Sequence, residues 1–185
     1  MSRIADPVPA KLDAEQRRIY DAIVAGPRGK VEGPLAVWVN NPGLAEPAQQ
    51  LGAYCRYGTS LPPRLAELAI VIAGAFWRAG YEWAYHAPIG VKAGLDAADL
   101  EKIRVGEAPR FKQQDEQTVY DFSMELLNTR RVPPPLWERA KAQLGEKALI
   151  DVVGILGYYS LISLTINAFE IPVPPGVKPP FENEA

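Results

Sequence analysis

The sequence predicts an all-α protein. Helix start and stop signals recur along the chain, and no useful length of alternating apolar and polar residues indicates a strand. The chain has 185 residues, of which 48% are hydrophobic, and this is sufficient for one domain with a folded core. Prolines crowd the C-terminal end and exclude a helix there. We therefore expect a single helical domain over residues 1–175 and an extended tail over residues 176–185.

The first helix is expected to begin at Asp13, which can cap it with Gln16 as the capping-box partner. Gly26 and the following proline end it. A loop rich in Gly, Pro and Asn then covers residues 26–43. Its apolar patch, residues 35–39, is either a strand or, as we expect, an ordered connection packed by its tryptophan.

Three further helices follow from the positions of proline and glycine. The second helix is expected over residues 44–57. The third begins at Pro62-Pro63, because proline is tolerated in a first turn, and continues to about Gly80. A fourth covers residues 81–92, with Pro88 inside it as the expected position of a kink.

The second half of the chain is also predicted to be helical. Asp96 is a typical N-cap for a short helix that ends by Gly106. Longer helices are expected over residues 115–129, 135–144 and 146–169.

Residues 152–169 form the most apolar segment of the chain and carry no charge. Their number reaches the threshold for a membrane span. However, they include glycine, serine, threonine and asparagine, and no basic residue flanks them on either side. We expect a central helix that is buried by its own domain or by a neighbouring subunit, with a membrane span as the alternative.

Composition excludes several classes of function. The net charge is −2 and no basic run occurs, so nothing indicates binding to nucleic acid. The single cysteine, Cys55, excludes an intramolecular disulfide and any CxxC redox or zinc motif. We expect Cys55 to be a small buried residue, with a reactive thiol as the alternative. The first residues do not form a signal peptide, which predicts a cytoplasmic protein.

The candidate site surrounds His86, the only histidine of the chain. Glu82 lies four residues before it, so both side chains lie on one face of a helix. A carboxylate at this position can orient the imidazole, fix its tautomer and favour its protonated form. Glu67 is a second charge in an otherwise apolar segment. These three residues are candidates for proton transfer. The alternative is a polar cluster in the core whose members only hydrogen-bond to one another.

Several segments resemble the carboxymuconolactone decarboxylase family, which shares its fold with alkylhydroperoxidase D. They are Leu61-Pro62-Pro63-Arg64-Leu65-Ala66-Glu67, Tyr81-Glu82-Trp83-Ala84-Tyr85-His86, Ala93-Gly94-Leu95-Asp96 and Asn167-Ala168-Phe169-Glu170-Ile171-Pro172. The resemblance extends over residues 12–175. It implies an alkylhydroperoxidase D-like helical bundle that is oligomeric, as a homotrimer or homohexamer, with the site near a subunit boundary.

The resemblance implies one of two reactions, because the family and its structural relatives include two branches with different chemistry. In the alkylhydroperoxidase branch a glutamate is followed by a CxxC pair and a histidine, and these acid–base positions fall on Glu67 and His86. The two cysteine positions fall on Ala79 and Glu82, so both thiols are missing. Since the thiolate is the nucleophile of that cycle, no local pair can supply it.

The decarboxylase branch implies cofactor-free decarboxylation or proton transfer on a small carboxylated lactone or keto acid. In this interpretation His86 is the general acid/base, Glu82 orients and charges it, and Glu67 is a neutral acid or relay. Aromatic residues near the motif are expected to line the substrate pocket, or else simply to fill the core. They are Trp77, Trp83 and Tyr85.

Other interpretations stay open. The protein could be an antioxidant that uses Cys55 or a partner thiol, or a binding oligomer without chemistry. A further alternative is an iron or manganese site built from the two glutamates and the histidine. We expect no cofactor and no metal, a small-molecule substrate, and no nucleic-acid or membrane partner.

Neither the substrate anchor nor the interface is defined by sequence. The basic residues near the segments that resemble the family are Arg56, Arg64, Arg78 and Lys92. Arg64 lies three residues before Glu67 and could instead form an ordinary helix ion pair with it. Self-association is expected through the apolar segment 152–169 or through the proline-rich tail.

Overall fold

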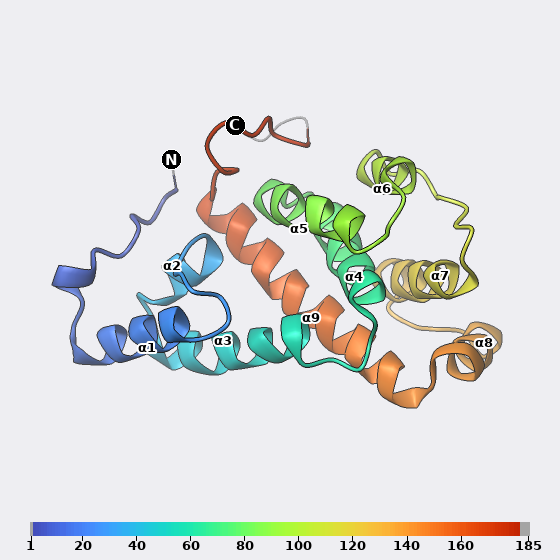
Figure 1. The fold of residues 1–185 in the computed structure, drawn as a ribbon, viewed down its shortest axis with the longest axis horizontal. Coiled ribbons are helices and arrows are strands. Elements are labelled where there is room, and N and C mark those ends of the chain that lie inside the picture. The colour runs from blue at the N-terminus through green and yellow to red at the C-terminus, as the bar shows by residue number, and fades with distance from the viewer. Residues whose placement is uncertain (1, 182–185) are drawn as a thin grey trace.

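The computed structural model describes residues 2–181 and is helical, without strands, over that range. Figure 1 shows the long helix α9 crossing the middle of the molecule, with α1 to α3 on one side and α4 to α7 on the other. The elements are a short 3-10 turn, η1 (Pro9–Lys11), and the α-helices α1 (Ala14–Ala25), α2 (Pro34–Trp38), α3 (Pro42–Tyr57), α4 (Pro63–Phe76), α5 (Gly80–Lys92), α6 (Ala97–Arg104), α7 (Gln114–Thr129), α8 (Pro134–Leu144) and α9 (Glu146–Phe169). The predicted all-α class is confirmed.

The predicted helix starts are confirmed where side chains cap them. The carboxylate of Asp13 accepts a hydrogen bond from the backbone N–H of Gln16 at 2.8 Å, and the Gln16 side chain accepts one from the Asp13 N–H at 3.1 Å. Asp96 accepts from the Ala98 N–H at 2.9 Å. Each cap satisfies N–H groups that the first turn leaves without a partner, so the start of the helix is encoded locally.

The apolar patch at residues 35–39 was predicted to be a connection or a strand, and this is wrong. It forms α2, whose five residues are all buried. The indole Nε1 of Trp38 donates to Thr165 Oγ1 on α9 at 3.0 Å. A short apolar run has no periodicity that separates a buried helical turn from a strand, so tertiary contacts decide.

The end of α4 also differs from the prediction, because the helix stops at Phe76 and not near Gly80. Arg78 adopts a left-handed conformation with φ 53°. The N–H of Ala79 then bonds to the carbonyl of Gly74 at 2.8 Å, and the N–H of Arg78 bonds to that of Ala75 at 3.0 Å. This pair of bonds is a Schellman motif, in which glycine usually occupies the position that Arg78 holds here. The usual sequence signal is therefore absent.

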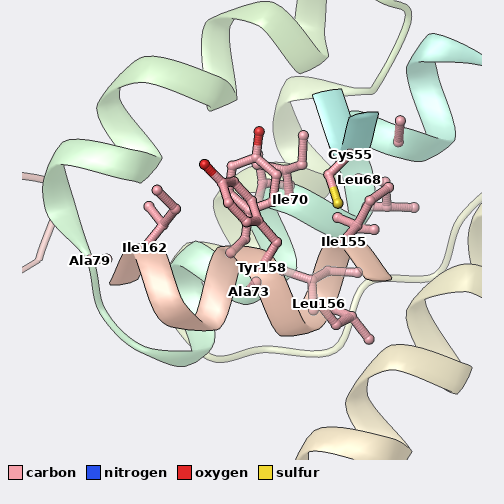
Figure 2. Packing of buried hydrophobic residues seen from close by; sticks show 14 of the residues in the cluster. Cys55, Leu68, Ile70, Ala73, Ala79, Ile155, Leu156, Tyr158 and Ile162 are labelled. Atoms are coloured by element: carbon pink, nitrogen blue, oxygen red, sulfur yellow. The ribbon is translucent and has the colours of Figure 1, made fainter. Parts of the chain in front are cut away.

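Helix α4 forms the centre of the core. Every residue from 68 to 73 is fully inaccessible to solvent, and α5, α7 and α9 pack around the helix. Figure 2 shows Leu68 and Ile70 beside Ile155 of α9 and the thiol of Cys55 of α3. Cys55 is 1% exposed, so the prediction that it is a small buried residue is confirmed.

Helix α9 is central, but its burial is one-sided within this chain. It is the one helix among the described residues that is long and apolar enough to cross a membrane, and 61% of that window is buried inside the molecule. Burial of this extent is typical of a core helix. The outward face nevertheless carries apolar side chains: Ile150, Val153, Leu161 and Leu164. We call these four residues the α9 stripe.

The C-terminal segment after α9 is not helical as far as it is described. It returns over α5 and α6, where the buried ring of Phe181 packs against Trp83 with ring centroids 5.9 Å apart. The guanidinium of Arg104 donates to the carbonyl of Pro180. Of the predicted tail, residues 182–185 lie outside the described part of the chain, as does residue 1 of the predicted domain.

Candidate functional site

Helices α4 and α5 place the three predicted acid–base residues together. Glu67 comes from α4, whereas Glu82 and His86 come from α5. The helices approach closely at two glycines. A Cβ at Gly74 would lie 3.6 Å from the Cβ of Glu82, and a Cβ at Gly90 would lie 3.8 Å from the Cβ of Glu67. The two helices therefore pack in direct contact here, and Glu67 of α4 reaches the imidazole on α5.

His86 is held between the two carboxylates. Its Nδ1 lies 2.7 Å from Oε2 of Glu67, and its Nε2 lies 3.0 Å from Oε1 of Glu82. All three side chains are buried, and His86 is only 3% exposed. The rings of Tyr85 and Tyr159 pack on the imidazole, with centroids 5.2 and 5.4 Å away. The predicted contact between Glu82 and His86 is thus present, and Glu67 completes it from the other side.

This arrangement favours the imidazolium. Burial by itself lowers the pKa of His86, because the charged form loses its hydration. The negative charge of Glu82 and the hydrogen bonds of both carboxylates oppose that effect and raise the pKa to about 9. At neutral pH both ring nitrogens therefore carry a proton, and each one donates to a carboxylate.

A cavity of about 50 Å³ lies against Glu82 and His86. That volume has room for several water molecules. Glu67 contacts the opposite nitrogen of the imidazole and does not line the cavity. Tyrosines and basic residues dominate the remaining lining: Arg28, Lys30, Arg56, Tyr81, Tyr85, Tyr158 and Tyr159.

Of the three aromatic residues predicted for the pocket, only Tyr85 lines this cavity. The indole Nε1 of Trp77 donates to Ser160 Oγ at 2.8 Å. Trp83 lines a separate groove beside the C-terminal segment. Successive residues of an α-helix point about 100° apart, so Trp83 points away from Glu82 even though it follows it directly.

The other tyrosines of the lining were missed by sequence reasoning. Tyr81 lies four residues before Tyr85, and their rings stack with centroids 6.4 Å apart. Tyr158 and Tyr159 lie in the middle of α9, which is mostly apolar. Polar aromatic residues in such a helix were the available signal, because a buried tyrosine needs a partner for its hydroxyl group.

Burial dominates the titration of these phenols. It raises the pKa of Tyr81, Tyr158 and Tyr159 above the ordinary value of 10. The nearby charge of Glu82 raises each of these pKa values further. The hydroxyl groups therefore keep their protons at neutral pH and remain hydrogen-bond donors.

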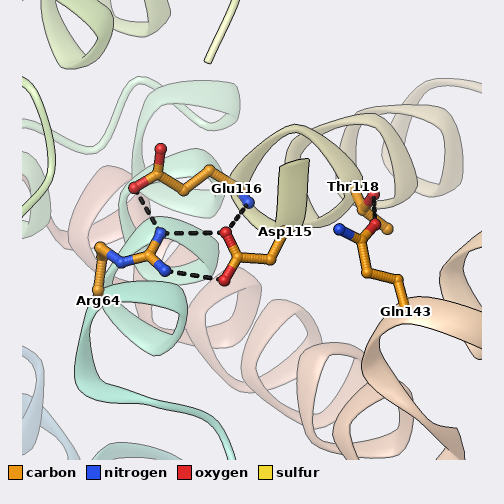
Figure 3. A network of polar contacts seen from close by, with 5 residues as sticks. All are labelled: Arg64, Asp115, Glu116, Thr118 and Gln143. Atoms are coloured by element: carbon orange, nitrogen blue, oxygen red, sulfur yellow. Dashed lines mark hydrogen bonds and ion pairs between the residues drawn. The ribbon is translucent and has the colours of Figure 1, made fainter. Parts of the chain in front are cut away.

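The four basic residues considered as substrate anchors have different environments in the structure. Arg56 lines the cavity. Arg64 does not pair with Glu67, because its guanidinium binds Asp115 and Glu116 of α7, as Figure 3 shows. The guanidinium of Arg78 lies 5.2 Å from the ring centre of Phe181. Lys92 is exposed at the end of α5.

Cys55 does not have the environment of a reactive thiol. Burial, followed by the charge of Asp151, raises its pKa to about 11, so the thiol keeps its proton at neutral pH. Among residues 2–181, no three His, Cys, Asp or Glu side chains are arranged to hold a metal ion. Both nitrogens of His86 are instead engaged by carboxylates.

Solved structures with the same helical arrangement identify the fold. An alkylhydroperoxidase core, a peroxidase-related protein from Ralstonia eutropha, is 14% identical, with a TM-score of 0.76 over 94% of this chain and 93% of that one. The chain has the alkylhydroperoxidase D-like fold. The resemblance predicted from sequence is thus confirmed for the fold.

Two more proteins with the alkylhydroperoxidase D-like fold match over nearly their full length. A peroxidase-related protein from a Silicibacter species is 13% identical, with a TM-score of 0.74 over 94% of this chain and 92% of that chain. A debrominase in complex with 2,3,4-tribromopyrrole is 12% identical, with a TM-score of 0.72 over 95% of both chains. No protein-family model and no curated protein sequence matches this chain. At these identities the likeness concerns the fold, and reaction chemistry has to be argued from the side chains.

Proposed function

We propose that this protein is a cofactor-free enzyme for decarboxylation or proton transfer, acting on a small carboxylated lactone or keto acid. The observation that carries the proposal is the position of His86. It is a buried imidazolium between two carboxylates, and it lies against a cavity. A charged acid that is buried beside a cavity is suited to delivering a proton to a carbanion as it forms.

The proposed reaction needs no electron acceptor. In a lactone or keto acid the bond between carbon and carboxylate breaks, and its electron pair moves into the adjacent conjugated carbonyl as an enolate. Carbon dioxide leaves, and the enolate carbon then takes a proton from the site. Because His86 lies against the cavity, the imidazolium is the donor of this proton, and Glu82, 3.0 Å from Nε2, holds the ring beside the substrate. Solvent restores it afterwards.

The remaining groups stabilise the charge that develops. Glu67 holds Nδ1 of the imidazole and fixes the direction of the ring. Tyr158 and Tyr159 line the cavity as protonated phenols and are suited to donating to the enolate oxygen. We assign His86 as the general acid/base, Glu82 as its partner at the cavity and Glu67 as the residue that orients it.

The antioxidant alternative requires a thiolate near the acid–base group. Cys55 is 1% exposed, and burial raises its pKa to about 11. These properties favour the thiol over the nucleophilic thiolate at neutral pH. We therefore rank thiol chemistry below proton transfer. A binding protein without chemistry remains the outcome if no substrate is turned over.

Self-association is also part of the proposal. The α9 stripe exposes four large apolar side chains on one helix, and burying them against another copy would remove this surface from water. We propose a homotrimer or homohexamer in the cytoplasm, with a small molecule as the substrate.

The test is a carbon dioxide release assay over a panel of carboxylated lactones and β-keto acids. His86→Gln should lower turnover about a hundredfold to ten-thousandfold, the range for one acid–base group. Glu82→Gln should be milder, because the amide still positions the ring. Glu46→Gln is the matched control, because it changes an exposed carboxylate that pairs with Arg18. Equal rates for wild type and His86→Gln would remove His86 from the mechanism, and no turnover of any substrate would favour the binding protein.

A further inference from the structure

Three basic side chains line the cavity beside His86, and two of them form no ion pair with a carboxylate of the described residues. Lys30 forms an ion pair with Glu32 at 2.7 Å. Arg28 and Arg56 have no carboxylate partner within residues 2–181. An arginine that faces a partly enclosed space without a carboxylate is suited to binding an anion from solution.

Arg56 is placed by aromatic rings. Its guanidinium lies 4.9 Å from the ring centre of Tyr85 and 5.2 Å from that of Tyr57. These contacts, with a side-chain hydrogen bond to Tyr85, hold the guanidinium at the cavity, and it forms no ion pair with a carboxylate of the described residues that would compete with an oxyanion. The ring of Tyr85 also contacts His86, at a centroid distance of 5.2 Å, so a single side chain separates Arg56 from the imidazole.

Arg28 approaches the same space from the loop between α1 and α2. Its Nε is buried and has no hydrogen-bond acceptor, although buried donors are nearly always paired. Its Nη2 lies 3.5 Å from the hydroxyl of Tyr158, and Gly52 makes room for both groups. A Cβ at Gly52 would lie 2.0 Å from that hydroxyl and 2.6 Å from Nη2. The loop thus places Arg28, whose Nε is unsatisfied, among the residues that line the cavity.

The charged side chains around the cavity do not balance one another, and the excess is positive. The ion pair of Lys30 is neutral, and the protonated His86 balances one of its two carboxylates. The second carboxylate balances one of the two arginines. One positive charge is left uncompensated, and a bound monoanion would neutralise it.

We infer that Arg28 and Arg56 form an anion subsite that holds a carboxylate of a small planar ligand beside the Glu82–His86 pair. This inference rests on the proposed function, whose substrate it specifies. The anchored carboxylate is not the one that leaves, because hydrogen bonds from arginine stabilise the carboxylate anion and oppose loss of carbon dioxide. The subsite therefore selects ligands that keep an acidic group throughout the reaction.

The experiment measures binding and needs no turnover. Isothermal titration calorimetry with 2-furoate, a small planar carboxylate, is compared with 2-furamide, its neutral analogue. Wild type should bind the acid and not the amide. Arg56→Met and Arg28→Met should each weaken 2-furoate binding about tenfold to hundredfold, the range for one charge-assisted hydrogen-bonded partner. Arg56→Lys, which keeps the charge but not the planar edge, should be intermediate.

Arg110→Met is the matched control, because this arginine is exposed and does not line the cavity. Far-UV circular dichroism checks that every variant is folded. The inference is overturned if wild type does not bind 2-furoate, if it binds the amide equally well, or if the folded Arg28→Met/Arg56→Met double variant binds like wild type. Binding that depends on these arginines without turnover of any lactone or keto acid would support the subsite and reject the proposed reaction.

Discussion

His86 should titrate far above the usual range for histidine, and this can be measured directly. Its pKa is about 9 in the folded protein, compared with an ordinary value of 6.5. Because the folded state binds the proton more tightly, folding is stabilised by protonation. This contribution is complete below pH 6.5 and is lost as the pH rises through about 9. At about 1.4 kcal/mol per pKa unit, the gap corresponds to roughly 3 kcal/mol of unfolding free energy.

The assay uses the fact that His86 is the only histidine of the chain. In tag-free protein the imidazole gives a single Cε1–H resonance, so its NMR titration needs no assignment. The midpoint should lie near 9 and should fall in Glu82→Gln, because that carboxylate is the strongest of the groups that raise the pKa. Glu46→Gln, at an exposed position away from the cavity, should leave the midpoint unchanged.

Urea unfolding at pH 6.5 and pH 9 measures the corresponding change in the free energy of unfolding. Both measurements use the same protein concentration, because association would otherwise change the apparent stability. Wild type should be more stable at pH 6.5 than at pH 9 by an amount comparable to the value above. A wild-type midpoint at or below 6.5, or an unfolding free energy that does not fall between these pH values, would refute the reasoning about the two carboxylates.

Two other predictions concern Cys55 and α9. Cys55→Ser should leave any native activity and the assembly essentially intact, as followed by the carbon dioxide assay and gel filtration; if turnover of an organic hydroperoxide were lost instead, the antioxidant function would rank first. Light scattering should find an oligomer for wild type and a smaller species for Leu161→Lys/Leu164→Lys, since two charges on the α9 stripe oppose its burial. A wild type that stays monomeric at micromolar concentration would reject this interface.

Local geometry explains which parts of the site the sequence could predict. The contact between Glu82 and His86 follows from a spacing of four residues on one helix, which any regular α5 reproduces. Glu67 was identifiable because a charge in an apolar helix requires a partner. That its partner is His86 and not Arg64 depends on the packing of α4 against α5 and α7.

The rest of the cavity depends on tertiary structure. Tyr158 and Tyr159 are more than seventy positions from His86 in sequence and reach it only because α9 crosses α4 and α5. Arg28 comes from a loop whose course no local signal determines. The break between α4 and α5 was missed for a different reason, because Arg78 adopts the left-handed conformation where a glycine would have marked the turn.

The double attachment of His86 also sets which bases can take its proton. An acid with a pKa near 9 is too weak to protonate a carboxylate or a lactone carbonyl at neutral pH, but an enolate carbon is basic enough to accept its proton. Rotation of the ring would break the bonds to Glu67 and Glu82 together, so the N–H directions are fixed before a ligand arrives. In the proposed reaction the two glutamates therefore determine when the proton is transferred, because they set the pKa of His86. The proton stays on the imidazole while the substrate is intact. It moves to the substrate once the enolate carbon is a stronger base than the imidazole.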